Sequence, residues 1–182
     1  MQTAYAHTGV EFLLANGFAG GFFHPLSGLD HLITMLGIGV WAGQLSVFDK
    51  KQVVKLPLTF VLGLIVGAIV GVMGIRFSFV ESGIAFSGLA LGFLILMQSK
   101  LSHIVLPRSI FAIVSVFGFS LFHGHAHGTE MVAHHSVVEY FFGFITASCV
   151  LHLLGIVFSL KVRPLFQAAV GLGMIVFFLV VI

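Results

Sequence analysis

The stretch HPLSGLDHLITMLGIGVWAG, residues 24–43, joins a polar cluster directly to an apolar run. The polar part contains His24, Asp30 and His31, and almost every residue after His31 is apolar. Ionisable side chains next to hydrocarbon are costly and generally have a function there. The stretch therefore predicts a transmembrane helix with a binding site at one of its ends.

The composition assigns the whole chain to the membrane. Its 182 residues are 59% hydrophobic and 8% charged, with a mean hydropathy of +1.17. Soluble domains usually carry about 25% charged residues, so residues 1–182 are expected to form one all-α integral membrane domain. A net charge of +2 gives no reason to expect nucleic-acid binding, and a single cysteine excludes a disulfide within the chain.

Six apolar runs are long enough to span a bilayer, which takes about 20 helical residues. They cover residues 28–47, 53–75, 81–100, 104–123, 134–160 and 163–182. A seventh run, residues 10–23, is short and glycine-rich, and predicts a half-helix or re-entrant segment, with a full span as the alternative. Small residues at four-residue spacing predict close helix contacts; they are Gly63, Gly67, Gly71, Gly88, Gly92, Gly143 and Ala147.

Basic residues give the expected orientation. Helices alternate in direction, so the loops within residues 50–55, 100–108 and 161–163 share one side, and they hold every Lys and Arg except Arg76. By the positive-inside rule that side is cytoplasmic, in a multi-pass protein of the inner membrane. The histidine-rich stretches around His24 and His123 then lie together on the non-cytoplasmic side.

The second polar stretch, FHGHAHGTE at residues 122–130, has metal-ligand spacing. In a helix, His123, His127 and Glu130 share one face while His125 points away. Gly128 and Gly124 weaken a helix, so part of the stretch is alternatively a loop. Imidazole and carboxylate ligands favour Ni²⁺, Co²⁺ or Zn²⁺ over Cu⁺.

The first polar stretch requires a bend to bind the same ion. Pro25 suits the first position of a helix and would leave His24 just outside it. A continuous helix would place His24 and His31 about 10 Å apart along its axis, so we expect the chain to fold back within residues 25–28. Asp30 is expected to bind the ion directly or to orient a histidine.

The N-terminal residues suggest one more ligand. The sequence AYA at residues 4–6 has the form of a signal-peptidase site. Cleavage after Ala6 would make His7 the first residue, with an α-amine and an imidazole as two further metal donors; the alternative is that His7 is only a solvated chain terminus.

The motifs HPLSGLDHLITM and FHGHAHGTE resemble the two signatures of the HupE/UreJ family of hydrogenase and urease accessory membrane proteins. The resemblance covers nearly the whole chain, from AHTG at residues 6–9 onward. It implies a nickel transporter, with cobalt as an alternative substrate. The sequence contains no nucleotide-binding motif, so we expect a secondary transporter that does not use ATP. The residues that match the family motifs are His24, Asp30, His31, His123, His125, His127 and Glu130.

Two further alternatives remain open from the sequence. One is an intramembrane zinc hydrolase similar to ceramidase-like enzymes, in which the metal would activate water. The other concerns assembly: the sequence is compatible both with a monomer and with a homo-oligomer. Outside the motifs, His103 is interpreted as an interfacial residue and His152 as a helix-packing residue.

Overall fold

The computed structural model describes residues 17–100, 108–131 and 136–181. Within these ranges the chain is all-helical, as the sequence predicts, and contains no strand. The helices are α2 (Gly17–Ser27), α3 (Leu29–Leu45), α4 (Gln52–Val72), α5 (Val80–Lys100), α6 (Arg108–Met131), α7 (Val137–Lys161) and α8 (Pro164–Val181).

The six long apolar runs correspond to α3 through α8. By length and composition, four of these described helices can cross a membrane: α4, α5, α6 over Ile110–Glu130, and α7. Helix α8 is apolar but shorter over Pro164–Val180, and α3 has 17 residues. The short run at residues 10–23 contributes to α2, a helix of 11 residues, and residues 10–16 lie outside the described part.

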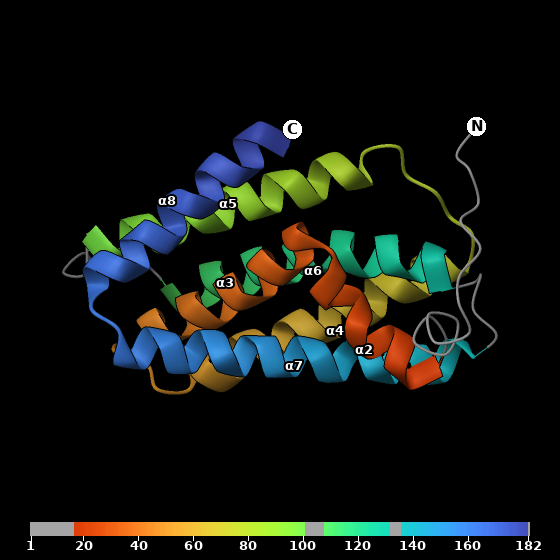
Figure 1. Cartoon of the computed structure of the whole chain (residues 1–182), viewed down its shortest axis with the longest axis horizontal. Coiled ribbons are helices and arrows are strands. Elements are labelled where there is room, and N and C mark those ends of the chain that lie inside the picture. Colours follow the sequence, from red (N-terminus) through yellow and green to blue (C-terminus); the bar gives the residue numbers. More distant parts are fainter. Residues whose placement is uncertain (1–16, 101–107, 132–135, 182) are drawn as a thin grey trace.

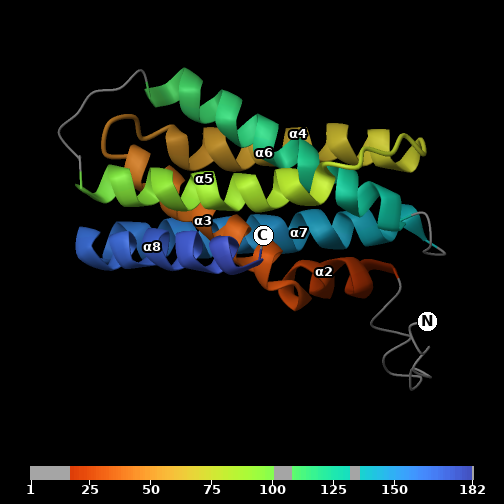
Figure 2. The same ribbon diagram turned by 90° about the horizontal axis from the view of Figure 1, so that it is seen from above.

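Helix α3 lies at the centre of the bundle. It contacts α4, α5, α7 and α8, and nearly every residue in its second half is buried. Around it, α4 packs against α6, α5 against α8, and α2 against α7 (Figures 1 and 2). The histidine-bearing parts of α2, α3 and α6 are thereby brought to one region of the bundle.

Glycines set the close approach of α4 and α6. A Cβ atom at Gly124 would overlap the carbonyl oxygen of Leu64, and one at Gly128 would overlap that of Ala68. From the other side, a Cβ at Gly67 would overlap a backbone carbonyl of α6. These contacts leave no room for side chains, which is how small residues at four-residue spacing pack membrane helices. They also explain why α6 stays helical through FHGHAHGTE, where the sequence left a loop open.

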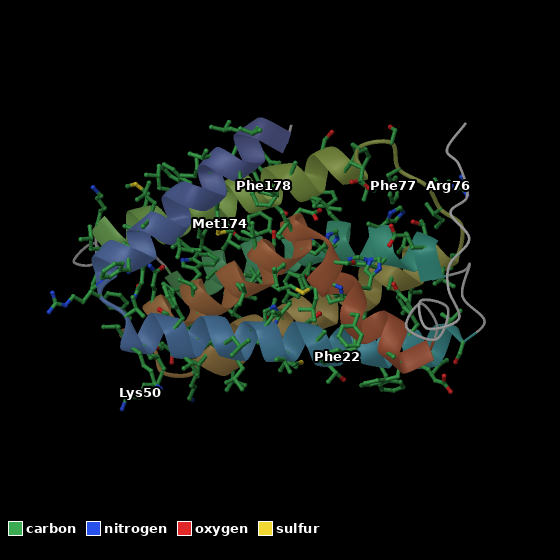
Figure 3. All side chains as sticks on the ribbon, in the orientation of Figure 1. Phe22, Lys50, Arg76, Phe77, Met174 and Phe178 are labelled. Carbon is green, nitrogen blue, oxygen red and sulfur yellow. The ribbon has the colours of Figure 1, made fainter. Side chains whose placement is uncertain are left out.

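The outer surface of the bundle suits lipid. Large apolar side chains are exposed on α5, α6, α7 and α8 (Figure 3), including Phe86, Val114, Leu153 and Leu179. No water-soluble bundle of this size would leave so many of them uncovered. The exposed surface therefore agrees with the multi-pass membrane protein that the composition predicts.

Basic residues gather at one end of the bundle, as predicted. Lys50 and Arg76 lie at opposite ends of the long axis (Figure 3). We call the end with Lys50 the lysine-rich end; it also contains the junctions of α3 with α4 and of α7 with α8. There Asp49 accepts a hydrogen bond from Lys55 Nζ at 2.8 Å, and this bond lowers the pKa of the Asp49 carboxyl below its usual range.

Candidate metal centre

Three side chains from two distant stretches of the sequence lie within reach of one ion. They are His24 on α2 and His127 and Glu130 on α6, and their ligand atoms lie within 4.8 Å of one another. Glu130 Oε2 lies 3.2 Å from His24 Nε2 and 3.3 Å from His127 Nδ1. This spread suits a divalent cation bound between the three ligand atoms. Bound nitrogen and oxygen ligands lie about 2.0–2.2 Å from such an ion, so the side chains would move closer to it.

A break at Gly28 brings the first polar stretch to this cluster. Gly28 separates α2 from α3 with φ −99° and ψ 116°, and the chain changes direction there (Figure 1). The ring centroids of His24 and His31 are 6.4 Å apart as a result. The bend therefore falls within the expected residues 25–28, but Pro25 does not begin a helix: Pro25 and His24 both lie inside α2, which ends at Ser27.

The close approach of α3 to Gly28 explains why the break occurs there. A Cβ atom on Gly28 would lie 3.0 Å from Asp30 Oδ1 and 3.2 Å from His31 Nδ1. Both distances are tighter than ordinary contacts, so a larger residue would displace these two side chains. Asp30 and His31 are themselves paired, with Oδ2 and Nδ1 separated by 3.0 Å.

A second group of histidines lies next to the cluster. The ring centroid of His31 is 4.4 Å from that of His127 and 5.2 Å from that of His123. His31 therefore stands between the two histidines of α6. The four imidazoles of His24, His127, His31 and His123 form a continuous row from α2 into the bundle.

Three of these imidazoles are oriented in the same way. His31 Nδ1 pairs with Asp30, His127 Nδ1 with Glu130, and His123 Nδ1 lies 3.0 Å from the Phe119 carbonyl oxygen. In a neutral imidazole, donation from Nδ1 leaves Nε2 with a free lone pair. Among the described residues, the Nε2 atoms of all three are buried and have no hydrogen-bond partner. Oxygen acceptors that fix Nδ1 and free Nε2 are the usual surroundings of metal-binding histidines.

A pocket leads from the Arg76 end of the bundle to Glu130. Its volume is about 330 Å³, and Glu81, Glu130, Thr129 and Arg76 contribute to its lining. Glu130 belongs both to this pocket and to the cluster with His24. A cation in this pocket would therefore lie next to Glu130, which also contacts His24 and His127.

Of the other sequence-predicted ligands, Asp30, His31 and His123 lie beside the cluster, and His125 belongs to neither group. His125 Nε2 donates a hydrogen bond to the Ile75 carbonyl oxygen at 2.6 Å, and its ring is tilted against that of Phe77, with the centroids 5.1 Å apart. It points away from the other histidines, as helical periodicity predicts, and holds the connection after α4 against α6. His7 lies outside the described residues.

Sequence reasoning missed the aromatic wall of the site. The Phe144 ring lies 4.2 Å from His127, and the Tyr140 ring lies 5.8 Å from His24. Both residues are buried on α7, one turn apart. Spacing of four residues signals a shared helix face, but nothing in the sequence indicates which partner that face meets.

The chain is similar to known proteins of one family. The family model described as "HupE / UreJ protein" matches residues 1–181. Protein HupE of Rhizobium leguminosarum bv. viciae is 38% identical over 153 residues, which cover 84% of this chain and 74% of that protein. No solved structure matches this chain.

Proposed function

This chain belongs to the HupE/UreJ family of hydrogenase and urease accessory transporters for nickel or cobalt, and from that premise we propose that it takes up Ni²⁺ across the inner membrane. The ion binds on the non-cytoplasmic side and leaves on the cytoplasmic side. Co²⁺ is the second expected substrate, and Zn²⁺ a weaker competitor. Members of this family are transporters, so the alternative of an intramembrane zinc hydrolase is set aside.

The observation that carries the proposal is the group formed by His24, His127 and Glu130. Two sequence-distant stretches supply its ligands, and both belong to the motifs that carry the family resemblance. Imidazole with carboxylate suits borderline divalent ions, whereas Mg²⁺ and Ca²⁺ prefer an all-oxygen shell. A group of three ligands also leaves positions on the ion free, which lets it bind and leave quickly.

The membrane potential supplies enough energy for uptake. A divalent cation that moves inward gains about 4–5 kcal/mol per 100 mV. This gain corresponds to more than a thousandfold accumulation, with about 1.4 kcal/mol for each factor of ten. Uptake without ATP is therefore sufficient, and consumption of the ion inside the cell would add to the gradient.

Cells that express the chain test the proposal. They are expected to accumulate Ni²⁺ and Co²⁺ above control cells, and to show no gain in Mg²⁺, because the imidazole ligands select against it. Metal contents are measured by mass spectrometry after exposure to an equal-concentration mixture. Equal gains for every divalent ion, or none for Ni²⁺, would contradict the proposed substrate.

The proposed orientation predicts which residues are accessible from each side. The lysine-rich end is expected to face the cytoplasm and the pocket around Thr129 the opposite side. Cysteine substitutions Lys51→Cys and Thr129→Cys, in a Cys149→Ala background, are labelled with a membrane-impermeant maleimide in intact cells. Thr129→Cys should react and Lys51→Cys should react only after lysis; reaction of both in intact cells would contradict this orientation.

Nickel binding is expected to weaken as the pH falls from 7 to 5. Only neutral imidazole binds a metal, and free imidazole has a pKa of about 6.5, so protons displace the ion over this range. The nickel complex is therefore stable at a pH above the imidazole pKa, and its affinity falls as the pH drops below that pKa. With at least two histidines bound, calorimetry should show a loss of affinity of about tenfold or more. A constant affinity from pH 7 to 5 would contradict the expected competition by protons.

A further inference from the structure

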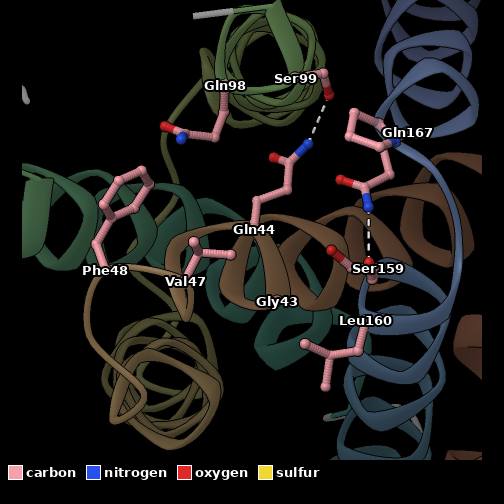
Figure 4. A pocket seen from close by; sticks show the side chains of 10 residues that line it. Gly43, Gln44, Val47, Phe48, Gln98, Ser99, Ser159, Leu160 and Gln167 are labelled. Atoms are coloured by element: carbon pink, nitrogen blue, oxygen red, sulfur yellow. Dashed lines mark hydrogen bonds between the residues drawn. The ribbon is translucent and has the colours of Figure 1, made fainter. Parts of the chain in front are cut away.

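The lysine-rich end of the bundle contains a pocket of about 460 Å³, whose lining includes several glutamine and serine residues. Figure 4 shows its polar lining, which comes from α3, α5, α7 and α8. Gln44 Nε2 donates a hydrogen bond to Ser99 Oγ at 2.7 Å, and Gln167 Nε2 donates one to the Ser159 carbonyl oxygen at 2.7 Å. The pocket lies at the opposite end of the bundle from Glu130.

Between this pocket and the candidate metal centre lies His152 on α7. Its side chain is 1% exposed, and among the described residues neither ring nitrogen has a hydrogen-bond partner. A buried polar group without a partner is costly, so its presence in an apolar bundle needs an explanation. A leucine or phenylalanine could fill this interior position without the free-energy cost of burying unpaired ring nitrogens.

A single aromatic ring separates His152 from the metal centre. The Phe60 ring centroid lies 5.0 Å from that of His152 and 5.9 Å from that of His123. Phe60 is fully buried. A change in the orientation of this one side chain would bring the two imidazoles into a common space.

Two serines share the α7 helix face of His152, and one of them, Ser159, lines the pocket. Ser148, His152 and Ser159 are buried and lie at positions i, i+4 and i+11, which share one helix face. This face meets glycines of α3: a Cβ at Gly39 would overlap the His152 carbonyl, and one at Gly43 would lie 2.6 Å from Ser159 Cβ. The interface of α3 and α7 therefore carries polar groups at mid-bundle and at the lysine-rich end, with Gly155 and Ile156 between the two levels.

We propose that His152 is a relay ligand, which takes a partly dehydrated Ni²⁺ from His123 and His31 and releases it toward the pocket at Gln44 and Ser159. This proposal rests on the proposed function and identifies the inward route. A neutral imidazole in mid-bundle supplies a lone pair where a divalent ion has lost most of its water. Its position on the far side of Phe60 makes it a step in transport and not part of the capture site.

The first test separates capture from transport. His152→Leu is expected to keep the calorimetric nickel affinity of the wild type, because the group of His24, His127 and Glu130 is unchanged. Its nickel uptake into proteoliposomes should fall about tenfold or more, the scale for loss of a supporting metal contact. Wild-type uptake by this variant would overturn the relay while leaving the proposed function intact. A wild type that transports no nickel would overturn the proposed function instead.

The second test distinguishes a ligand from a packing residue. In a Cys149→Ala background, His152→Cys replaces imidazole with a soft thiolate ligand, so uptake of Cd²⁺ relative to Ni²⁺ should rise. Ser87→Cys is the matched control: Ser87 is fully buried on α5, outside the α3–α7 contact, and should leave the ratio unchanged. An unchanged ratio in His152→Cys, with both ions slowed alike, would assign His152 to packing and overturn the relay. Thermal unfolding of each variant verifies that it is folded.

Discussion

Replacing His127 with alanine is expected to reduce the nickel affinity of the purified protein by about 100-fold, the upper range for loss of support at a metal site. His127 contacts Glu130 through Nδ1 and stands next to the rings of both His24 and His31. Its loss therefore removes a ligand and also the partner that fixes the Glu130 carboxylate. Isothermal titration calorimetry in detergent measures the effect.

The same helix offers a matched control for this result. His125→Ala removes an imidazole two residues away that is hydrogen-bonded to the Ile75 carbonyl oxygen and not to the cluster. It should cost about 1 kcal/mol of stability, the scale of one hydrogen bond, and leave nickel affinity at the wild-type level. Equal losses of affinity in the two variants would show that the cluster is not the binding site.

Adding one methyl group at Gly124 is expected to destabilise the bundle by about 3 kcal/mol, the upper range for overpacking. The new Cβ in Gly124→Ala would overlap the Leu64 carbonyl oxygen, and a helix backbone cannot move aside as a flexible side chain can. Helices α4 and α6 would separate, and the histidines on α6 would lose their positions. Thermal unfolding in detergent measures the change.

Gly118→Ala provides the control on the same helix. A Cβ at Gly118 has no atom within 4 Å, so alanine should fit there without strain. Replacing glycine in a helix usually stabilises it, by about 1 kcal/mol. If Gly124→Ala were as stable as Gly118→Ala, close packing through glycines would not hold α4 against α6.

The fold was largely predictable because lipid imposes simple rules. Apolar length predicts each of α3 through α8, and the glycine spacing predicts a close-packed face on α4, but not that α6 is its partner. A loop within residues 122–130 was left open because Gly124 and Gly128 weaken a helix, but α6 stays helical there, since the tight contact with α4 favours glycine at these positions. Helix propensity describes an isolated helix, whereas the conformation of α6 at these glycines is determined by its packing against α4.

The residues of the candidate site could be predicted from the sequence, but their arrangement in space could be predicted only in part. Charge distribution placed His24 and His127 at the same end, and periodicity separated His125 from its neighbours. The exact bend at Gly28 depends on space for Asp30 and His31, which no local pattern encodes. His152 was interpreted as a packing residue because only apolar residues flank it, and its unpaired nitrogens become evident only when its surroundings are known.

The central claim is that Ni²⁺ passes through the bundle from the site at Glu130, driven by the membrane potential. Proteoliposomes that contain a nickel-quenched dye and a potassium gradient test it, because valinomycin then sets an inside-negative potential. The wild type should quench the dye faster as the potential rises, and Glu130→Gln should remain near the rate of empty liposomes. Potential-independent quenching, or equal rates for wild type and Glu130→Gln, would contradict the account.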